Sequence, residues 1–303
     1  MDLTKSPLTA PLDSDQPTKT YLDSQRVPTL VLPPKSCDSH FHIFGPASSF
    51  PYSDKRNFTP VDAPKEKLFA LHQRVGIERG VIVHTALHGF DLRVTEDAIA
   101  HGGGRYVGIA LVEPSVSQTE LLRLKAAGFR GVRFNFMKHL PAAMPAGDLV
   151  KFCERLADID MHLQVHFEKE LIATLAPTFS SCAKLLPVVL DHMGRVDARD
   201  GLTGEHYSAL CRLMDEPHFY VKVSGIDRVD DQPPYLAGKQ LAADLVQRYP
   251  EQCLWGLDWP HPNHTHVPDD VTLVEALIDI APSPAALETL LVHNPQRLFQ
   301  FED

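Results

Sequence analysis

The chain has 303 residues, of which 44% are hydrophobic, so it can bury a sizeable core in one large α/β domain or in two ordinary ones. Its formal net charge of −10 argues against a nucleic-acid partner, because such partners are bound through basic surfaces. No run approaches the roughly 18 apolar residues of a membrane-spanning helix, and the first residues lack the basic-then-apolar order of a secretory signal. We therefore expect a cytoplasmic protein without a membrane partner.

The cysteines are odd in number, scattered along the chain and never spaced as C-x-x-C. This arrangement indicates neither a disulfide framework nor a thiolate zinc site, because both need cysteines that pair or cluster. We expect reduced, buried thiols at Cys37, Cys153, Cys182, Cys211 and Cys253.

Residues 1–30 are rich in Pro, Ser, Thr and Asp and show no apolar period, which predicts a flexible N-terminal arm. From residue 31 onward, short β-branched runs alternate with longer amphipathic segments, as in repeated βα units around a parallel sheet. Residues 31–303 are therefore expected to form a single catalytic domain.

Eight runs have the length and composition of buried strands. In chain order they are Cys37–Phe44, Gly80–Thr85, Tyr106–Val112, Gly131–Phe136, Leu163–Phe167, Pro187–Asp191, Phe219–Val223 and Cys253–Leu257. Helical patterns lie at Gln118–Ala127, Leu149–Asp158, Glu205–Met214, Leu236–Arg248, Val271–Ile280 and Pro284–Phe299. This alternation predicts an α/β fold of the (β/α)8 TIM-barrel type, with a doubly wound open sheet as the competing architecture.

Polar residues interrupt the ends of most of these strands. In "SCDSHFHIFGP", Asp38, His40 and His42 occupy alternate positions and so point to one face of a strand. The later strands end near Arg133 and Asn135, His166 and Glu168, Asp191, His192 and Arg195, Lys222 and Ser224, and Asp258. Each residue alone has a structural explanation, such as capping by the aspartate. Because barrel chemistry takes place at the C-terminal strand ends, the joint pattern predicts one active site there.

Two further groups of histidines lie near this predicted site. His84 and His88 follow the second strand and are candidates for the pocket lining. His261, His264 and His266 form "PHPNHTH" after the eighth strand. They are compatible with a second metal site, although a loop that shapes the pocket is the simpler interpretation.

The order H-x-H, His, His, Asp along successive strands resembles the amidohydrolase superfamily over residues 31–301. Within it, "DSHFHIFGP", "FPYSDKRNFTP", "RGVRFNF", "LDHMGR" and "LWGLDWPHPN" are similar to the branch of the 2-pyrone-4,6-dicarboxylate lactonases and 4-sulfomuconolactone hydrolases. The resemblance implies a catalytic group of His40, His42, His192 and Asp258, and anchors for an anionic substrate at Arg133, Arg195 and Arg228.

Two positions depart from the pattern of the pyrone lactonases. His166 stands where those proteins typically carry a tyrosine, and His139 stands where they carry another arginine. The lost arginine removes a clamp for a carboxylate. We keep His139, together with His88, as a candidate substrate contact.

The histidine at position 166 adds a possible metal ligand. The pyrone lactonases are regarded as metal-free, whereas superfamily members with the full ligand set hold a divalent ion. Three imidazoles and one carboxylate suit a catalytic zinc ion. We therefore expect one zinc ion on His40, His42, His166 and Asp258, with a metal-free mechanism, in which Asp258 alone activates water, as the alternative.

The resemblance implies a lactonase, a hydrolase of carboxylic esters that opens an anionic unsaturated lactone from aromatic-compound catabolism. The candidates are 4-sulfomuconolactone, muconolactone and 2-pyrone-4,6-dicarboxylate. Water activated by the metal or by Asp258 would attack the carbonyl, while His192 would polarise the carbonyl or shuttle protons. Two alternatives stay open: a metal-dependent nonhydrolytic decarboxylase, and a non-catalytic barrel that binds a small molecule. The sequence leaves the oligomeric state open, a homodimer included.

Overall fold

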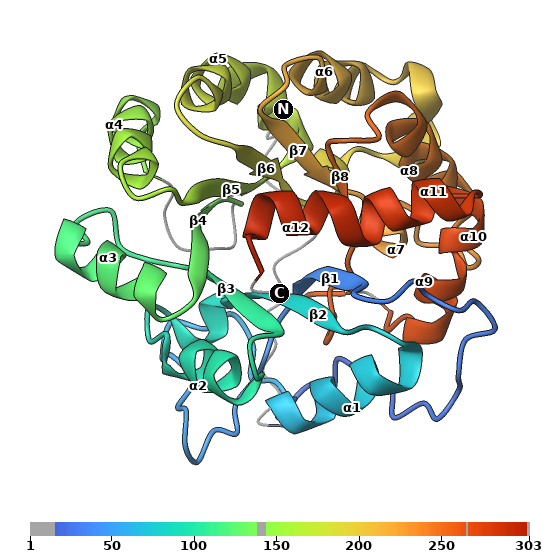
Figure 1. Ribbon diagram of the computed structural model, residues 1–303, viewed down its shortest axis with the longest axis horizontal. Coiled ribbons are helices and arrows are strands. Elements are labelled where there is room, and N and C mark those ends of the chain that lie inside the picture. The colour runs from blue at the N-terminus through green and yellow to red at the C-terminus, as the bar shows by residue number, and fades with distance from the viewer. Residues whose placement is uncertain (1–15, 138–143, 265, 302–303) are drawn as a thin grey trace, which may run out of the picture.

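The structure is a computed structural model, and it describes residues 16–137, 144–264 and 266–301. In these residues one eight-stranded sheet has its strands in the order β1 to β8, each parallel to the next (Figure 1). The strands are β1 (Cys37–Phe41), β2 (Arg79–Val83), β3 (Tyr106–Ala110), β4 (Phe129–Phe136), β5 (His162–Phe167), β6 (Val188–Leu190), β7 (Phe219–Lys222) and β8 (Cys253–Leu254). Helices surround the ring of strands, so the predicted (β/α)8 barrel is confirmed and the doubly wound sheet is excluded.

The helices in the described residues follow the strands in turn. They are α1 (Lys65–Val75), α2 (Arg93–His101), α3 (Gln118–Ala126), α4 (Ala146–Ala157), α5 (Ile172–Ala183), α6 (Glu205–Met214), α7 (Ile226–Val229), α8 (Leu236–Arg248), α9 (Asp270–Glu275), α10 (Leu277–Ile280), α11 (Pro284–Glu288) and α12 (Asn294–Phe299). Short 3₁₀ turns occur in several loops, and a π-helical turn, Thr289–His293, joins α11 to α12.

The prediction for α6 and α8 agrees with the structure at both ends. The predicted helix Val271–Ile280 is instead two short helices, α9 and α10, which meet at Ala276. A long helix missing from the prediction is α5. Pro177 lies inside it, and an internal proline predicts a helix break because it lacks the N–H that the helix needs.

The barrel closes between β8 and β1 through the segment that follows β8. β8 is shorter than predicted, but the backbone N–H of Ser39 donates to the carbonyl of Trp255 at 2.8 Å. The N–H of Asp258 donates to the carbonyl of His40 at 2.7 Å, and the N–H of His42 donates to that of Trp259 at 2.7 Å. These bonds set Asp258 directly beside His40 in β1 and His42 just after it.

The other end of the barrel is covered by α12. Leu298 and Phe299 pack with inward-facing residues such as Val81 and Val189 in one buried apolar cluster. Arg130, at the start of β4, donates to the carbonyl of Phe299 at 3.1 Å. Figure 1 shows α12 crossing the centre of the barrel. The end formed by the C-terminal ends of the strands is therefore left for the site.

The described part of the predicted arm, residues 16–30, lies against the barrel without forming a helix. Thr18 makes an isolated bridge with Pro60, and the buried Tyr21 donates to the carbonyl of Asp62 at 3.1 Å. Thr29 donates to Glu275. Flexibility over residues 1–30 stays a prediction.

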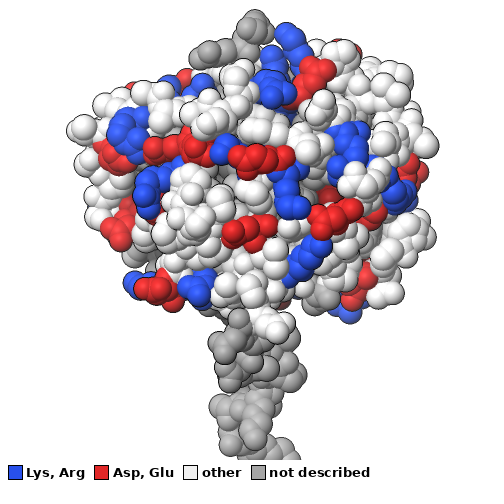
Figure 2. Space-filling model, turned by 90° about the horizontal axis from the view of Figure 1, so that it is seen from below, with Lys and Arg blue, Asp and Glu red and all other residues white. Residues whose placement is uncertain are grey.

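All five cysteines are buried and free, as expected. Among the described residues, no helix combines the length and the apolar character needed to cross a membrane. Figure 2 shows acidic and basic side chains intermingled over one face, without a continuous basic surface in that view.

Candidate active site

Asp38 fixes the backbone around the histidines of β1. Its Oδ1 accepts the N–H of His40 at 3.0 Å and the N–H of Leu257 at 3.1 Å, so one carboxylate holds β1 and the segment before Asp258 together. Gly256 makes this close approach possible, because a Cβ there would lie 2.6 Å from the backbone nitrogen of His40. Asp38 therefore has a structural role, whereas His40, two residues later, belongs to the site.

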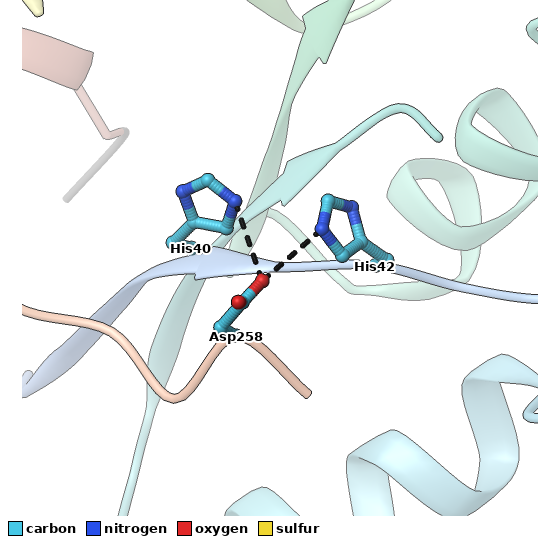
Figure 3. A group of neighbouring side chains, drawn as sticks. All are labelled: His40, His42 and Asp258. Carbon is cyan, nitrogen blue, oxygen red and sulfur yellow. Dashed lines mark ion pairs between the residues drawn. The ribbon is translucent and has the colours of Figure 1, made fainter. Parts of the chain in front are cut away.

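His40, His42 and Asp258 form a compact group at the C-terminal end of the barrel (Figure 3). Oδ1 of Asp258 lies 3.2 Å from Nε2 of His42 and 3.6 Å from Nε2 of His40. All three side chains are buried. Nε2 of His40 and Oδ1 of Asp258 have no hydrogen-bond partner in the described part of the chain. Two imidazoles and a carboxylate that face one space in this way fit a single divalent ion.

The tautomer of His42 follows from its partner. Its Nδ1 lies 2.7 Å from the carbonyl oxygen of Val83, which can only accept, so Nδ1 donates the ring proton. Nε2 therefore keeps its lone pair and directs it toward Asp258.

His40 contacts buried charges on its other side. The fully buried Lys222 lies with Nζ 3.2 Å from Nδ1 of His40 and donates to Oε1 of Gln164 at 2.9 Å. Oδ1 of Asp191 lies 3.7 Å from the same Nζ. Burial lowers the pKa of Lys222 to about 8, so the ammonium is still mainly charged at neutral pH and balances Asp191.

Asp258 is held by Arg228. Nε of Arg228 donates to Oδ2 in a short ion pair, and Nη2 donates to the carbonyl of Pro262 at 3.0 Å. Burial opposes ionisation of Asp258, but the guanidinium of Arg228 outweighs it and holds the pKa of the carboxyl well below its usual range. Asp258 is therefore a carboxylate at neutral pH.

The "LDHMGR" motif forms a left-handed turn after β6. The φ angles of His192, Met193 and Gly194 are 49°, 52° and 61°, and that of Arg195 is 55°. Residues other than glycine rarely adopt this conformation, because their Cβ atom clashes with the backbone. Backbone strain of this kind concentrates at functional sites.

This turn places His192 beside Asp258. Nδ1 of His192 lies 3.0 Å from Oγ of Ser224, and Nε2 lies 3.7 Å from Oδ2 of Asp258. Burial holds the pKa of His192 well below its usual value, so the ring is neutral at pH 7 and can act as an acceptor.

Arg133 and His166 pair with each other rather than with the group in Figure 3. Nη2 of Arg133 lies 2.8 Å from Nδ1 of His166, and Nε lies 3.0 Å from Oδ2 of Asp191. A guanidinium can only donate, so Nδ1 of His166 accepts and its Nε2 carries the proton. His166 is not among the side chains that gather around Asp258 as possible ligands. The geometry therefore supports three of the four expected zinc ligands and gives His166 a different partner.

One pocket opens onto this group. Its walls are formed by His42, Asn57, Phe58, Thr85, Ala86, Leu87, Arg133, Asn135, His166, His192, Arg195, Arg228, Asp258, Pro262 and Asn263. Three arginines thus face the pocket against a single carboxylate, Asp258. Burial lowers the pKa of Arg195 to about 10, which leaves it charged at neutral pH. The excess of positive charge suits an anionic ligand.

The structure does not place His88 in the lining. Its Nε2 accepts the N–H of Gly45 at 3.1 Å, and its Nδ1 lies 3.1 Å from the carbonyl of Pro51, so both ring nitrogens serve the backbone. His84 is likewise bonded, to Thr95 at 2.9 Å. His139 lies outside the described residues.

Three polar lining residues were missed by sequence reasoning. Asn57, Thr85 and Asn263 come from loops, which have no apolar period to mark them, and Asn57 donates to Asn263 at 2.6 Å. Two of them lie in motifs that carry the family resemblance, which could have marked them. Asn57 lies within "FPYSDKRNFTP", and Asn263 ends "LWGLDWPHPN".

Comparisons with known proteins identify the family of this chain. A family model described as Amidohydrolase matches residues 37–301. The chain is 38% identical over 287 residues to a 2-pyrone-4,6-dicarboxylate hydrolase of Comamonas testosteroni, covering 91% of this chain and 93% of that protein. It is 38% identical over 274 residues to a 4-sulfomuconolactone hydrolase of Hydrogenophaga intermedia, covering 89% and 90% of the two chains.

A similar solved structure is that of a probable 2-pyrone-4,6-dicarboxylic acid hydrolase from Acinetobacter baumannii with citric acid bound. It matches with a TM-score of 0.79 at 25% identity, over 88% of this chain and 100% of that one. The family match and the two full-length relatives span the whole barrel, including every residue of the group in Figure 3. The chain therefore belongs to the amidohydrolase family.

Proposed function

We propose that this protein is a lactone hydrolase that opens an anionic unsaturated lactone, with Asp258 accepting the proton of the attacking water. The observation that carries the proposal is a pocket with three arginines that ends on one ionised, buried carboxylate. The arginines suit the acid groups of the substrate, and the carboxylate suits general-base chemistry at its carbonyl.

The two oxygens of Asp258 have different surroundings. Oδ2 is held by Arg228, whereas Oδ1 has no hydrogen-bond partner among the described residues and faces His42. A water molecule that donates to Oδ1 is positioned to attack a carbonyl bound in the pocket. The oxygen of water bonds to the carbonyl carbon, its proton passes to Oδ1, and the ring C–O bond breaks.

The low pKa of Asp258 makes it a weak base, so a nearby cation would help to acidify the water. His40, His42 and Asp258 would hold a divalent ion such as zinc, which lowers the pKa of bound water toward about 7. In the metal-free alternative, Asp258 activates the water without this help.

His192 completes the proton path. Its neutral ring lies beside Asp258 and is oriented by Ser224. We assign it the transfer of the proton to the ring oxygen that leaves, a step for which a neutral imidazole is well suited.

The relatives narrow the substrate class. Their names specify a dicarboxylated pyrone and a sulfonated muconolactone, both of which are anionic lactones. Arg195 and Arg133 are the proposed anchors for such carboxylate or sulfonate groups, because a guanidinium offers them two parallel hydrogen bonds.

A screen of candidate lactones tests the proposal. Purified protein is mixed with 2-pyrone-4,6-dicarboxylate, 4-sulfomuconolactone and muconolactone, each with and without a chelator, and the ring-opened acid is quantified by chromatography. We expect hydrolysis of at least one lactone. Release of CO2 in place of a ring-opened acid would instead indicate a decarboxylase. Tight binding without turnover would indicate a non-catalytic barrel.

A further inference from the structure

A second group of possible metal ligands lies beside the pocket, outside the group in Figure 3. Asp227 belongs to α7, and His261 and His264 belong to the loop after β8. One ligand atom from each of the three lies within 4.8 Å of the others. The side chains of Asp227, His261 and His264 are no more than 5% exposed.

The polar atoms that face one another in this group lack ordinary partners. Both carboxylate oxygens of Asp227, Nδ1 of His261 and Nε2 of His264 have no hydrogen bond within the described residues. Nε2 of His264 does lie 2.8 Å from Oδ2 of Asp227, but the two are not aligned as a hydrogen bond. Buried polar groups without partners are costly, so four of them at one place indicate that something binds between them.

The second nitrogen of His261 shows how that ring is oriented. Its Nε2 lies 2.9 Å from Oδ1 of Asp270, an acceptor, so Nε2 donates a ring proton, and Nδ1 is the nitrogen left for a ligand. A histidine that donates one nitrogen to a carboxylate and offers the other to an ion is a recurring feature of metal sites. Burial lowers the pKa of His264 to about 4, so this ring is neutral at pH 7. Burial also opposes protonation of His261, but Asp270 and Asp227 outweigh it and raise its pKa, so an ion bound at Nδ1 takes the place of a proton.

The arginine next to Asp227 in the chain is paired with other groups. Arg228 follows it in the chain, but its guanidinium is bonded to Asp258 and to the carbonyl of Pro262. The charge of Asp227 is thus left for another positive group.

We propose that Asp227, His261 and His264 form a second metal site, which takes a divalent first-row ion of the zinc class. Two imidazoles and one carboxylate leave a position for water. The ion joins α7, which carries Arg228, to the loop that carries Pro262 and Asn263, and it thereby fixes two walls of the pocket. The site does not depend on lactone hydrolysis.

The test isolates the proposed site by working in a His40→Gln background. This change removes a ligand both of the group in Figure 3 and of a neighbouring possible group, His40, Asp191 and His192. Full-length protein is stripped with a chelator and titrated with zinc against a chromogenic competitor. We expect about one zinc ion per chain in this background. Adding His264→Gln or Asp227→Asn should weaken zinc binding roughly tenfold or more.

His293→Gln is the control, because the exposed His293 lies in the π-helical turn before α12 and pairs with Glu288, outside the cluster. It should leave zinc affinity unchanged. The melting temperature gives a second readout, since bound zinc raises it only where the site is intact. Equal zinc affinity with and without His264, or no zinc uptake by the His40→Gln protein, would overturn the proposal. Asp227→Asn provides the answer if His264→Gln does not fold.

Discussion

Nε2 of His42 and Oδ1 of Asp258 lie 3.2 Å apart as two acceptors that face each other. In the neutral tautomer that donates Nδ1–H to the carbonyl of Val83, Nε2 of His42 and Oδ1 of Asp258 both act as acceptors. Two lone pairs at this distance repel unless a proton or a metal ion lies between them. The pair therefore supports the proposal that a cation, either a metal ion or a proton, binds between these two atoms.

Removal of a metal ion should test this directly. We expect prolonged dialysis against a chelator to lower the turnover number about 100-fold or more, and added zinc to restore it, because the ion acidifies the attacking water. Elemental analysis before and after dialysis is the companion measurement. Full activity with less than about a tenth of a zinc ion per chain would establish the metal-free mechanism instead.

Asp258→Asn should lower the turnover number by about 1,000-fold or more, because the amide cannot take the proton of water. The change also leaves Arg228 without its ion-pair partner, so a lower melting temperature is expected, with the fold retained in circular dichroism. Asp200→Asn, at an exposed position, is the control. Near-normal turnover by Asp258→Asn would remove Asp258 from the mechanism.

His192→Asn should lower the turnover number about 100- to 10,000-fold with little change in KM, because His192 is assigned to proton transfer rather than to substrate capture. Ser224→Ala removes the hydroxyl that lies 3.0 Å from Nδ1 of His192 and should have a smaller effect of the same kind. Steady-state kinetics distinguish proton transfer from substrate binding. A rise in KM alone would mean that His192 only binds substrate.

Arg195→Lys should raise KM about tenfold and leave the turnover number nearly unchanged, since lysine keeps the charge but not the two parallel hydrogen bonds. Arg199→Lys is the matched control, because Arg199 is exposed and pairs with Asp197 away from the group in Figure 3. An unchanged KM for Arg195→Lys would show that the acid group of the substrate is held elsewhere.

His162 gives a prediction for stability against pH. Burial lowers its pKa to about 3, so between pH 6.5 and 3 the unfolded chain binds a proton that the folded protein does not. Its contribution to stability is full above pH 6.5 and is lost as the pH falls, at up to about 1.4 kcal/mol per pH unit.

The free energy of unfolding, measured with denaturant between pH 7 and 4, should therefore fall less steeply for His162→Gln than for the natural chain. His101→Gln, at a side chain that is 60% exposed, should leave the slope unchanged. Equal slopes for all three proteins would mean that His162 is protonated in the folded state.

The order of the strands and much of their extent were readable from the sequence. Short β-branched runs separated by helical segments have a local signal, since each strand is buried on both faces in a parallel barrel. The start of β1, the whole of α6 and the placement of His40 and His42 on one face followed from these periods. The family pattern added Asp258 and His192, and the structure brings both to the same pocket.

The pairing within the site was decided only by the tertiary structure. His166 bonds to Arg133 instead of joining His40 and His42, and Arg228 holds Asp258. These contacts join residues that are far apart in the chain, and they depend on left-handed turns and on the closure of β8 against β1, none of which has a period in the sequence. The sequence by itself therefore determined which strand-end residues reach the mouth of the barrel, while the folded chain determined which of them pair with one another. The physical reason is that local periodicity reports burial, whereas partnership between charges depends on distances that only the closed barrel sets.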